Sequence, residues 1–382
     1  AAAEVEVENI TTTPSEFNAQ NTWNGSEIAT TFSWGEGTAE KPYLIADGAE
    51  LAYLANQVNN GNTYEGKYFQ LASDIDLGNN EWTPIGNTEV PFMGVLDGAG
   101  HTIAYAKITI SSLPDQAYES YGIFGSIGGG SSRSIIRNLE IVSVNVDITA
   151  SGATGSRWQG QNEEGIRIGC LAGTLFKNTS LENIIVSGSS IYDTNTIQVY
   201  NYQFQFAVGG VVGYITNTSS SDDDPGEGSR YVINNCYSNV EITLDSTATV
   251  TTNGWNRTDG RGQYHTGGIV GTIRSQAVWP TNCLYDGEIQ ANGYIGPIFA
   301  ALIDSTDYSA MSQDIWNSND AGNLTTNNAY YTNYSAAGTT FTQSVTSGNS
   351  TARVSTRNTQ VGYVQGVNKG SYTTNMSNIL NI

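Results

Sequence analysis

The chain has 382 residues, with 36 acidic against 15 basic side chains and a formal net charge of -21. This charge excludes nucleic-acid duplexes and anionic membrane surfaces as partners, because both would repel the protein. Only 13% of the residues are charged and 43 are glycine, which suits short strands and tight turns better than helices, so we expect an all-β protein. No run of about 18 apolar residues is present, which argues against membrane insertion.

The first segment, residues 1–32, precedes any repeat. Residues 4–10 alternate acidic and apolar side chains, a pattern that predicts a strand with one buried face. We expect this segment to pair at a sheet edge, either within its own chain or in a partner.

A lead-in region, residues 33–103, comes next. Apolar residues recur at helical spacing behind Asp47, whose side chain can cap free backbone N–H groups, so the sequence predicts one short helix over residues 49–58. Short strands are predicted at residues 68–71 and 75–77.

Residues 104–303 repeat a phrase made of a small residue, two apolar residues, a second small residue, a variable residue and another apolar one. The copies lie at residues 122–127, 170–175, 210–215, 268–273 and, in weaker form, 297–302. Its glycines are Gly122, Gly125, Gly173, Gly210, Gly213, Gly268 and Gly271. Such an internal repeat predicts a stack of similar coils, each burying its apolar face against its neighbours. We expect the glycines to let the backbone bend at corners between sheets.

A second phrase follows each copy and carries an asparagine at one register. These asparagines are Asn138, Asn183, Asn235 and Asn282. In stacked coils their side-chain amides would form a ladder that satisfies turn backbone groups and the amides themselves. We favour this structural role over a role in ligand binding.

Polar insertions separate the copies and make their spacing irregular. They fall at residues 152–164, 219–229 and 251–264, and their composition predicts loops on the side of the stack. Residues 304–382 are rich in Thr, Asn, Ser and Tyr, and we expect them to form capping coils or a capping hairpin that closes the last coil.

The repeats resemble the GLUG-motif family of bacterial and archaeal surface proteins, whose signature is a small-apolar-small phrase like residues 268–271. The lead-in phrases at residues 67–77, 82–86 and 92–103 also resemble the sequence that precedes such repeats. The resemblance covers residues 34 to about 300 and implies a right-handed parallel β-helix, or β-solenoid, that is secreted or surface-attached and adhesin-like. Three positions depart from the motif: Cys170, Pro297 and Ala300.

The chain has three cysteines, too few for a disulfide framework and at spacings that fit no zinc site. Cys236 and Cys283 occupy equivalent places in the second phrase, so they are expected in neighbouring coils. Buried thiols that pack as small hydrophobic groups are the favoured interpretation. A disulfide between adjacent coils is the alternative.

The sequence gives little reason to assign a catalytic or binding role to either of the two histidines. His101 lies in a glycine-rich turn, and a general base there would need a neighbouring carboxylate to orient it, so we favour a turn or packing role. His265 lies within a basic patch that could contact an acidic sugar. Asp74 and Asp76 share a strand face, as a pair of glycosidase carboxylates could, but we expect them to bond turn amides.

The inserted loops hold the remaining candidate sites. Asp222, Asp223 and Asp224 could bind calcium, although they lack the spacing of a calcium loop and a solvated acidic loop is favoured. We therefore expect no cofactor. Trp158, Trp255 and Tyr264 could stack on sugar rings, or simply pack beneath the loops.

Nine Asn-x-Ser/Thr triplets would mark exposed turns if the protein is glycosylated. They begin at Asn9, Asn24, Asn178, Asn217, Asn256, Asn323, Asn333, Asn349 and Asn375.

Taken together, the sequence predicts a non-enzymatic extracellular or cell-surface protein that serves as a structural or adhesin-like scaffold. Its expected partners are extracellular matrix, host or cell-surface glycans, or proteins. One alternative is a filament subunit whose N-terminal strand completes a sheet in the next copy of the chain. A second alternative is a β-helix that binds or cleaves polysaccharide.

Overall fold

The computed structural model describes the chain in segments. They are residues 17–114, 117–150, 152–154, 164–193, 197–199, 204–216, 231–244, 249–250, 264–273, 280–281, 283–285, 287–291, 294–296, 299–302, 330–331, 343–345, 352–354 and 360–361.

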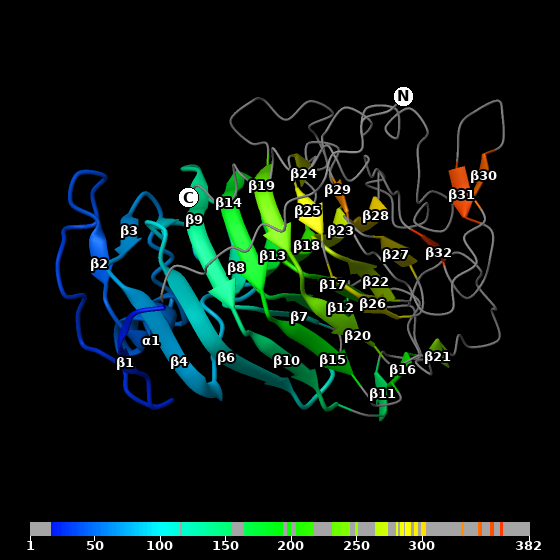
Figure 1. The fold of residues 1–382 in the computed structure, drawn as a ribbon, viewed down its shortest axis with the longest axis horizontal. Helices are drawn as coiled ribbons and strands as arrows, with labels where there is room; N and C mark the ends of the chain where they lie inside the picture. Colours follow the sequence, from blue (N-terminus) through cyan, green and yellow to red (C-terminus); the bar gives the residue numbers. More distant parts are fainter. Residues whose placement is uncertain are drawn as a thin grey trace, which may run out of the picture.

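The described chain is all-β apart from one helix, and five sheets account for its strands (Figure 1). At the N-terminal end lie β1 (Ala19–Thr22), β2 (Tyr43–Ile45), α1 (Gly48–Asn59), β3 (Tyr68–Leu71), β4 (Asp74–Glu81) and β5 (Val95–Asp97). These five strands join a 16-stranded sheet, which continues through β6 (Thr102–Ile110), β9 (Ser134–Val142), β10 (Asn145–Ile148), β14 (Thr179–Ser187), β15 (Ser190–Asp193), β19 (Val232–Ser238), β20 (Glu241–Thr243), β24 (Pro280–Thr281), β25 (Leu284–Tyr285), β26 (Ile289–Gln290) and β29 (Tyr330–Tyr331).

The other sheets are smaller. The five-stranded sheet holds β8 (Phe124–Ile127), β13 (Ala172–Leu175), β18 (Val212–Ile215), β23 (Val270–Ile273) and β28 (Phe299–Leu302). The six-stranded sheet holds β7 (Tyr118–Tyr121), β12 (Glu164–Gly169), β17 (Phe204–Gly209), β22 (Tyr264–Gly267), β27 (Tyr294–Gly296) and β32 (Gln360–Val361). A three-stranded sheet holds β11 (Gly152–Thr154), β16 (Ile197–Val199) and β21 (Thr249–Val250), and the last pair is β30 (Gln343–Val345) with β31 (Ala352–Val354).

Successive repeats visit the sheets in the same order and stack on one another. The chain runs through β7, β8, β9, β10 and β11 in one coil, then through β12, β13, β14, β15 and β16 in the next. Each of these strands pairs in parallel with its equivalent in the following coil, and every pairing of the named strands is parallel except that of β30 with β31. This topology is consistent with the predicted stack of coils.

One core runs through the stack. The apolar positions of the repeat phrase point inward, so Ile127, Leu175, Ile215 and Ile273 are all fully buried and belong to a cluster that extends from Trp23 to Phe299. Residues of the lead-in region join the same sheets, because Ile85 and Phe92 form bridges to β8. Burial of branched apolar side chains between stacked coils is therefore the main stabilising contribution along the whole stack.

The predicted helix is present and extends one residue beyond the predicted range at each end. The Asp47 side chain accepts a hydrogen bond from the Glu50 N–H at 3.0 Å and caps the helix. Leu51, Leu54 and Val58 are fully buried and face the core. In Figure 1, α1 lies at the N-terminal end of the stack, where it contacts β4.

The glycines of the repeat have two different roles. Gly122, Gly210 and Gly268 lie in two-residue bends between strands, as expected. Gly125, Gly173, Gly213 and Gly271 instead lie inside strands, so the expectation of corner glycines does not hold for them. A Cβ atom on Gly213 would lie 2.5 Å from the Ile168 nitrogen and 2.7 Å from the Gly173 oxygen, which identifies close backbone approach as the reason for glycine.

Three of the four repeat asparagines form a side-chain ladder. Asn183 Nδ2 donates to Asn138 Oδ1 at 2.9 Å, and Asn235 Nδ2 donates to Asn183 Oδ1 at the same distance. All three have φ angles between 52° and 60°, a conformation that asparagine tolerates better than most residues. The ladder begins one coil earlier on an acid, because Asn138 Nδ2 donates to Asp97 Oδ1 at 3.1 Å. Asn282 lies outside the described residues.

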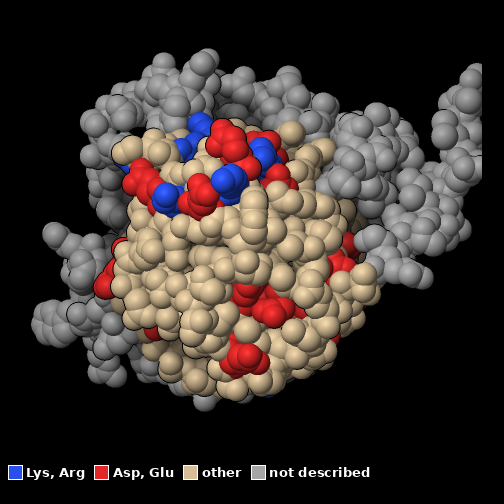
Figure 2. All heavy atoms as spheres, turned by 90° about the vertical axis from the view of Figure 1, so that its left-hand side faces the viewer, with Lys and Arg blue, Asp and Glu red and all other residues tan. Residues whose placement is uncertain are grey.

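Charged side chains are unevenly spread over the N-terminal end of the stack. In Figure 2 basic and acidic side chains alternate along one edge of this face, while much of the remaining described surface carries neither. The exposed Lys41–Glu36 ion pair, at 2.9 Å, belongs to this end of the molecule. Such exposed pairs contribute little to stability.

Candidate functional site

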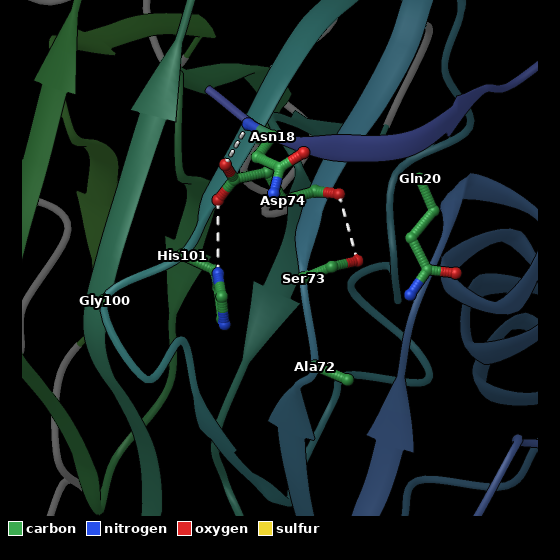
Figure 3. A pocket seen from close by; sticks show the side chains of 7 residues that line it. All are labelled: Asn18, Gln20, Ala72, Ser73, Asp74, Gly100 and His101. Atoms are coloured by element: carbon green, nitrogen blue, oxygen red, sulfur yellow. Dashed lines mark hydrogen bonds and ion pairs between the residues drawn. The ribbon is translucent and has the colours of Figure 1, made fainter. Parts of the chain in front are cut away.

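A cavity of about 490 Å³ opens near the N-terminal end of the stack (Figure 3). It lies between β1, the connection from β3 to β4, and the turn that follows β5. Its lining residues are Asn18, Gln20, Ala72, Ser73, Asp74, Gly100 and His101. The volume is in the range of small-molecule sites in proteins.

Asp74 is held in place by backbone donors from two other segments. It is the first residue of β4, which pairs with β1 on one side and with β6 on the other. Asn18 N donates to Asp74 Oδ2 at 2.6 Å, and Thr102 N donates to Asp74 Oδ1 at 2.9 Å. The side chain is 10% exposed, so its carboxylate has a fixed orientation at the edge of the cavity.

His101 is brought to Asp74 by the turn after β5. Asp97 Oδ1 accepts a hydrogen bond from the Ala99 N–H at 2.8 Å, and Ala99 and Gly100 both have positive φ angles. The turn closes when His101 N donates to Gly98 O at 2.8 Å. As a result His101 Nδ1 lies 3.3 Å from Asp74 Oδ1, with 36% of the side chain exposed.

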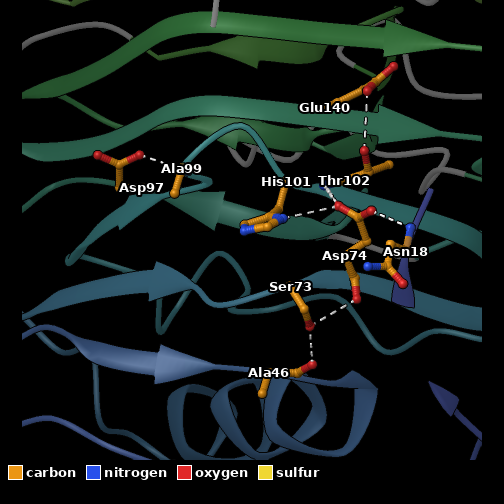
Figure 4. A network of polar contacts seen from close by, with 9 residues as sticks. All are labelled: Asn18, Ala46, Ser73, Asp74, Asp97, Ala99, His101, Thr102 and Glu140. Carbon is orange, nitrogen blue, oxygen red and sulfur yellow. Dashed lines mark hydrogen bonds and ion pairs between the residues drawn. The ribbon is translucent and has the colours of Figure 1, made fainter. Parts of the chain in front are cut away.

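A second carboxyl lies behind this pair (Figure 4). Glu140 on β9 is paired with Thr102 on β6, and Thr102 Oγ1 donates to Glu140 Oε2 at 3.2 Å. Burial raises the pKa of Glu140 above its ordinary value of 4.5, and the nearby Asp74 carboxylate raises this pKa further. Thr102 therefore donates to both carboxyl groups, to one through its N–H and to the other through its hydroxyl.

Ser73 lines the cavity and is held by its own hydrogen bonds. Its hydroxyl donates to Ala46 O at 2.5 Å, which ties the start of β4 to the residue just before the helix N-cap. The same hydroxyl also lies 3.3 Å from the backbone oxygen of Asp74, and Figure 4 shows both contacts.

The Asp74–His101 pair can act as a hydrogen-bonding group or as a base. With the proton on Nδ1 facing the carboxylate, the Nε2 lone pair is directed away from Asp74, as Figure 3 shows for the ring. A histidine oriented in this way can accept a proton from a hydroxyl group or a water molecule. The structure thus supplies the orienting carboxylate that a basic His101 requires.

The other histidine and the other strand acid lie elsewhere. His265 is 5% exposed, and its Nδ1 lies 2.9 Å from Thr272 Oγ1 between two sheets, so it does not present a sugar-binding surface. Asp76 accepts hydrogen bonds from Gly78 N and Thr22 Oγ1, both at 2.8 Å. Asp76 therefore holds β1 and a turn, and it does not join Asp74 at the cavity.

Most of the predicted loop sites fall outside the described residues. These are Trp158, Trp255, the proposed calcium ligands Asp222, Asp223 and Asp224, and the glycosylation triplets at Asn9, Asn217, Asn256, Asn323, Asn333, Asn349 and Asn375. Of Tyr264 the structure describes the backbone, which begins β22.

Two glycosylation triplets can be placed. Asn24 is exposed, and its Oδ1 accepts a hydrogen bond from Ser26 N at 3.0 Å. Asn178 does not lie on an exposed turn, contrary to the expectation for a glycosylation triplet. It is 6% exposed, and its Nδ2 already donates to Gly130 O and Ser131 O. A glycan on Asn178 would have to displace these contacts.

The three cysteines are buried free thiols. Burial raises the pKa of Cys170 to about 12. The neighbouring Cys283 thiol, together with burial, raises the pKa of Cys236 well above its usual range. Both effects favour the unreactive thiol over the thiolate.

Within the described segments, no group of three or more His, Cys, Asp or Glu side chains is arranged to hold a metal ion. In the same part of the chain, no helix has the length and apolar character needed to cross a membrane.

The cavity could not be predicted from the sequence. The turn that carries His101 and the strand that carries Asp74 are both recognisable there, but their pairing joins residues 27 positions apart through the stacking of coils. Nothing in the sequence marks Asn18 and Gln20 as residues of a site, because β1 lies outside every repeat phrase.

Comparisons with known proteins give partial similarities. No family model matches the chain. It is 33% identical over 144 residues to a protein named as a Gly-rich membrane protein from Evansella cellulosilytica, a match that covers 36% of this chain and 15% of the relative. It is 28% identical over 203 residues to halomucin from Haloquadratum walsbyi, covering 50% of this chain and 2% of halomucin. The chain thus spans a small part of either relative.

A solved structure named as an immunoglobulin A1 protease from Bacteroides ovatus also matches. It is 18% identical and covers 91% of this chain and 89% of that chain, with a TM-score of 0.31. At this TM-score the likeness carries no inference about fold or activity.

Proposed function

We propose that the chain is a non-enzymatic, extracellular or cell-surface scaffold: a right-handed parallel β-helix of the GLUG-repeat type that acts as a structural or adhesin-like module. The observation that carries the proposal is the in-register stacking of equivalent strands from coil to coil over one continuous core. Such a stack makes a stiff body, because each coil is fixed by the coils on both sides. Its side loops are free to vary and to contact partners, for which we expect matrix, host or cell-surface glycans or proteins.

The relatives' names support the location. One is named a membrane protein and the other a halomucin, and the acidic composition of this chain suits an exposed surface that remains soluble through charge repulsion. The matches cover 36% and 50% of this chain and 15% and 2% of these proteins, so the similarity concerns a part of each.

The location can be tested by treating intact producing cells with a protease and detecting the protein with an antibody. We expect the protein in the medium, or on intact cells in a form that the protease removes. Recovery solely from the cytosol after lysis would refute the proposal. A glycan and matrix-protein array probed with the purified chain then identifies the partner class.

Filament formation is a second candidate function. Its supporting observation is β1, which pairs in parallel with β4 and shows that the N-terminal region adds a strand to a coil. Residues 4–10, the predicted donor strand, lie outside the described residues. Deleting residues 1–12 should abolish polymers if this strand is donated to a neighbour, and unchanged particle size would exclude donation.

A sugar-processing role is the third candidate, and the Asp74–His101 pair is the observation that favours it. Incubation with neutral and uronic-acid polysaccharides, followed by assay of reducing ends and unsaturated products, tests cleavage. Any product that disappears in the His101→Ala variant would replace the scaffold proposal with an enzymatic one.

A further inference from the structure

The cavity beside His101 has an unusual lining for a protein with this charge. Asp74 and His101 are its titratable residues, and Asn18, Gln20 and Ser73 supply neutral polar groups. Among the residues that the structure describes, no lysine or arginine lines it. A ligand carrying a negative charge would therefore meet a carboxylate without a balancing cation.

Two hydrogen-bonding groups of the cavity, those of Asp74 and His101, are already oriented. Asp74 is fixed by the two backbone donors of Asn18 and Thr102, and it faces His101 Nδ1. The Nε2 atom thus presents a lone pair, or on protonation an N–H, at a defined place. The Gln20 side chain is exposed and forms no hydrogen bond to any described residue, so its amide is free to donate and accept.

We propose that this cavity is a binding site for a neutral sugar. One hydroxyl group of the sugar donates to His101 Nε2, and adjacent hydroxyl groups exchange hydrogen bonds with the side-chain amides of Asn18 and Gln20. Hydroxyl groups suit this lining because each can donate and accept, as the amides can, and because they bring no charge to Asp74. The site is separate from the loop tryptophans considered as sugar contacts. It uses the Asp74–His101 pair of the sugar-processing candidate, but it requires binding alone and no cleavage, and it goes beyond the scaffold role.

The two histidines make a direct test possible. The chain has two in total, and His265 is buried against Thr272, so its ring serves as an internal control. The full chain, labelled with ¹³C at histidine, is titrated with D-glucose, D-galactose and D-mannose while the Cε1–Hε1 signals are recorded. We expect at least one hexose to shift the His101 signal saturably while the His265 signal stays in place.

Matched acidic sugars test the role of charge. D-glucuronate and D-galacturonate carry a carboxylate in place of one hydroxymethyl group, and we expect each to bind more weakly than the corresponding hexose. Equal or tighter binding of the uronate would overturn the assignment to a neutral sugar.

Substitution of Gln20 tests the cavity without disturbing the fold, since this side chain is exposed. Gln20→Ala should weaken hexose binding by about three- to tenfold, the effect of one hydrogen bond between neutral groups. Gln57→Ala on α1, the same change outside the cavity, should leave binding unaltered. The absence of any saturable shift at His101, or an unchanged affinity in Gln20→Ala, would overturn the proposal. Neither result bears on the location of the protein, which the protease experiment decides separately.

Discussion

Asn183 occupies the middle of the asparagine ladder. It donates to Asn138, accepts from Asn235, and has a φ angle of 56°. Two requirements therefore meet at one residue: an amide side chain for the ladder and tolerance of the left-handed conformation. Each can be removed separately by the choice of substitution.

We predict that Asn183→Gly lowers the free energy of unfolding by about 1–3 kcal/mol, because the partners in the ladder lose a hydrogen bond in a half-buried place. Asn183→Ala should cost about 1–2 kcal/mol more, since alanine is disfavoured at positive φ. Urea denaturation followed by circular dichroism measures both. An alanine variant as stable as the glycine variant would contradict the assigned backbone conformation.

The environment of Glu140 should make the free energy of unfolding depend on pH. Burial is the largest cause that raises the pKa of Glu140 in the folded state, the Thr102 hydrogen bond partly opposes this rise, and the Asp74 carboxylate adds to it. The folded protein therefore holds this proton more tightly than the unfolded chain does, and the contribution of Glu140 to stability falls as pH rises from 4.5 through the folded pKa.

The Glu140→Gln variant should lack this loss while keeping an oxygen that accepts from Thr102. Relative to the native chain, it should become more stable as the pH is raised from below 4.5 to neutrality. Urea unfolding of both proteins across this range provides the comparison. The exposed Glu241→Gln on β20 is the control, and a difference that stays constant with pH would argue against a buried Glu140.

The chemistry of single residues was partly predictable. The turn around His101 follows from its glycines, and the need for a carboxylate partner follows from the chemistry of a histidine base. The identity of that partner did not follow, because Asp74 reaches His101 through the pairing of β4 with β6. Local sequence does not encode which residues of successive coils become neighbours at the end of the stack.

At the scale of elements, two sheets approach each other so closely that some strand positions have room only for glycine. Gly213 in β18 lies against the backbone of β12 and β13, where an added Cβ would meet Ile168 N at 2.5 Å. These neighbours are backbone atoms that cannot move aside individually.

Gly213→Ala should therefore destabilise the protein by at least about 1–3 kcal/mol, the usual cost of overpacking a core. Gly130→Ala is the control, because its nearest atoms belong to the Glu65 side chain, whose displacement costs only exposed hydrogen bonds from Ser131 N and Ser132 N. A shift of the thermal unfolding midpoint in the first variant and little shift in the second is expected. If both variants unfold at the native midpoint, the two sheets do not approach as closely as described.

Elements with local causes were predicted best. The helix over residues 48–59 follows from the Asp47 cap and the helical spacing of its apolar residues, both of which act within one turn. The role of the strand glycines was misassigned to corners because close approach between sheets is a tertiary property. Strand β1 (Ala19–Thr22) was missed because its pairing depends on Asp74 and Asp76, whose side chains accept from Asn18 and Thr22.

At the scale of the molecule, the repeat predicted stacking, and stacking determines which residues share a face. The register along β6, β10, β15, β20 and β26 places one residue of each strand in a row. These residues are Thr109, Asp147, Tyr192, Thr243 and Gln290. Although 181 residues separate the first from the last in sequence, the row crosses only four strand spacings. Sequence periodicity alone could not fix this register, because insertions make the repeats unequal in length.

The most direct test of the stacked-coil account is a set of distances along this row. Spin labels are attached through cysteine at Thr109 and, in turn, at Thr243 or Gln290, while the native cysteines, which are 0% exposed, stay unlabelled. Neighbouring strands lie about 4.8 Å apart, so the backbone separation should be about 14 Å for Thr109 and Thr243 and about 19 Å for Thr109 and Gln290. Pulsed electron paramagnetic resonance should therefore show a distance for the second pair that is longer by about one strand spacing. Distances that do not increase in this order, or that exceed these separations by more than the length of the label arms, would contradict the stack of parallel coils.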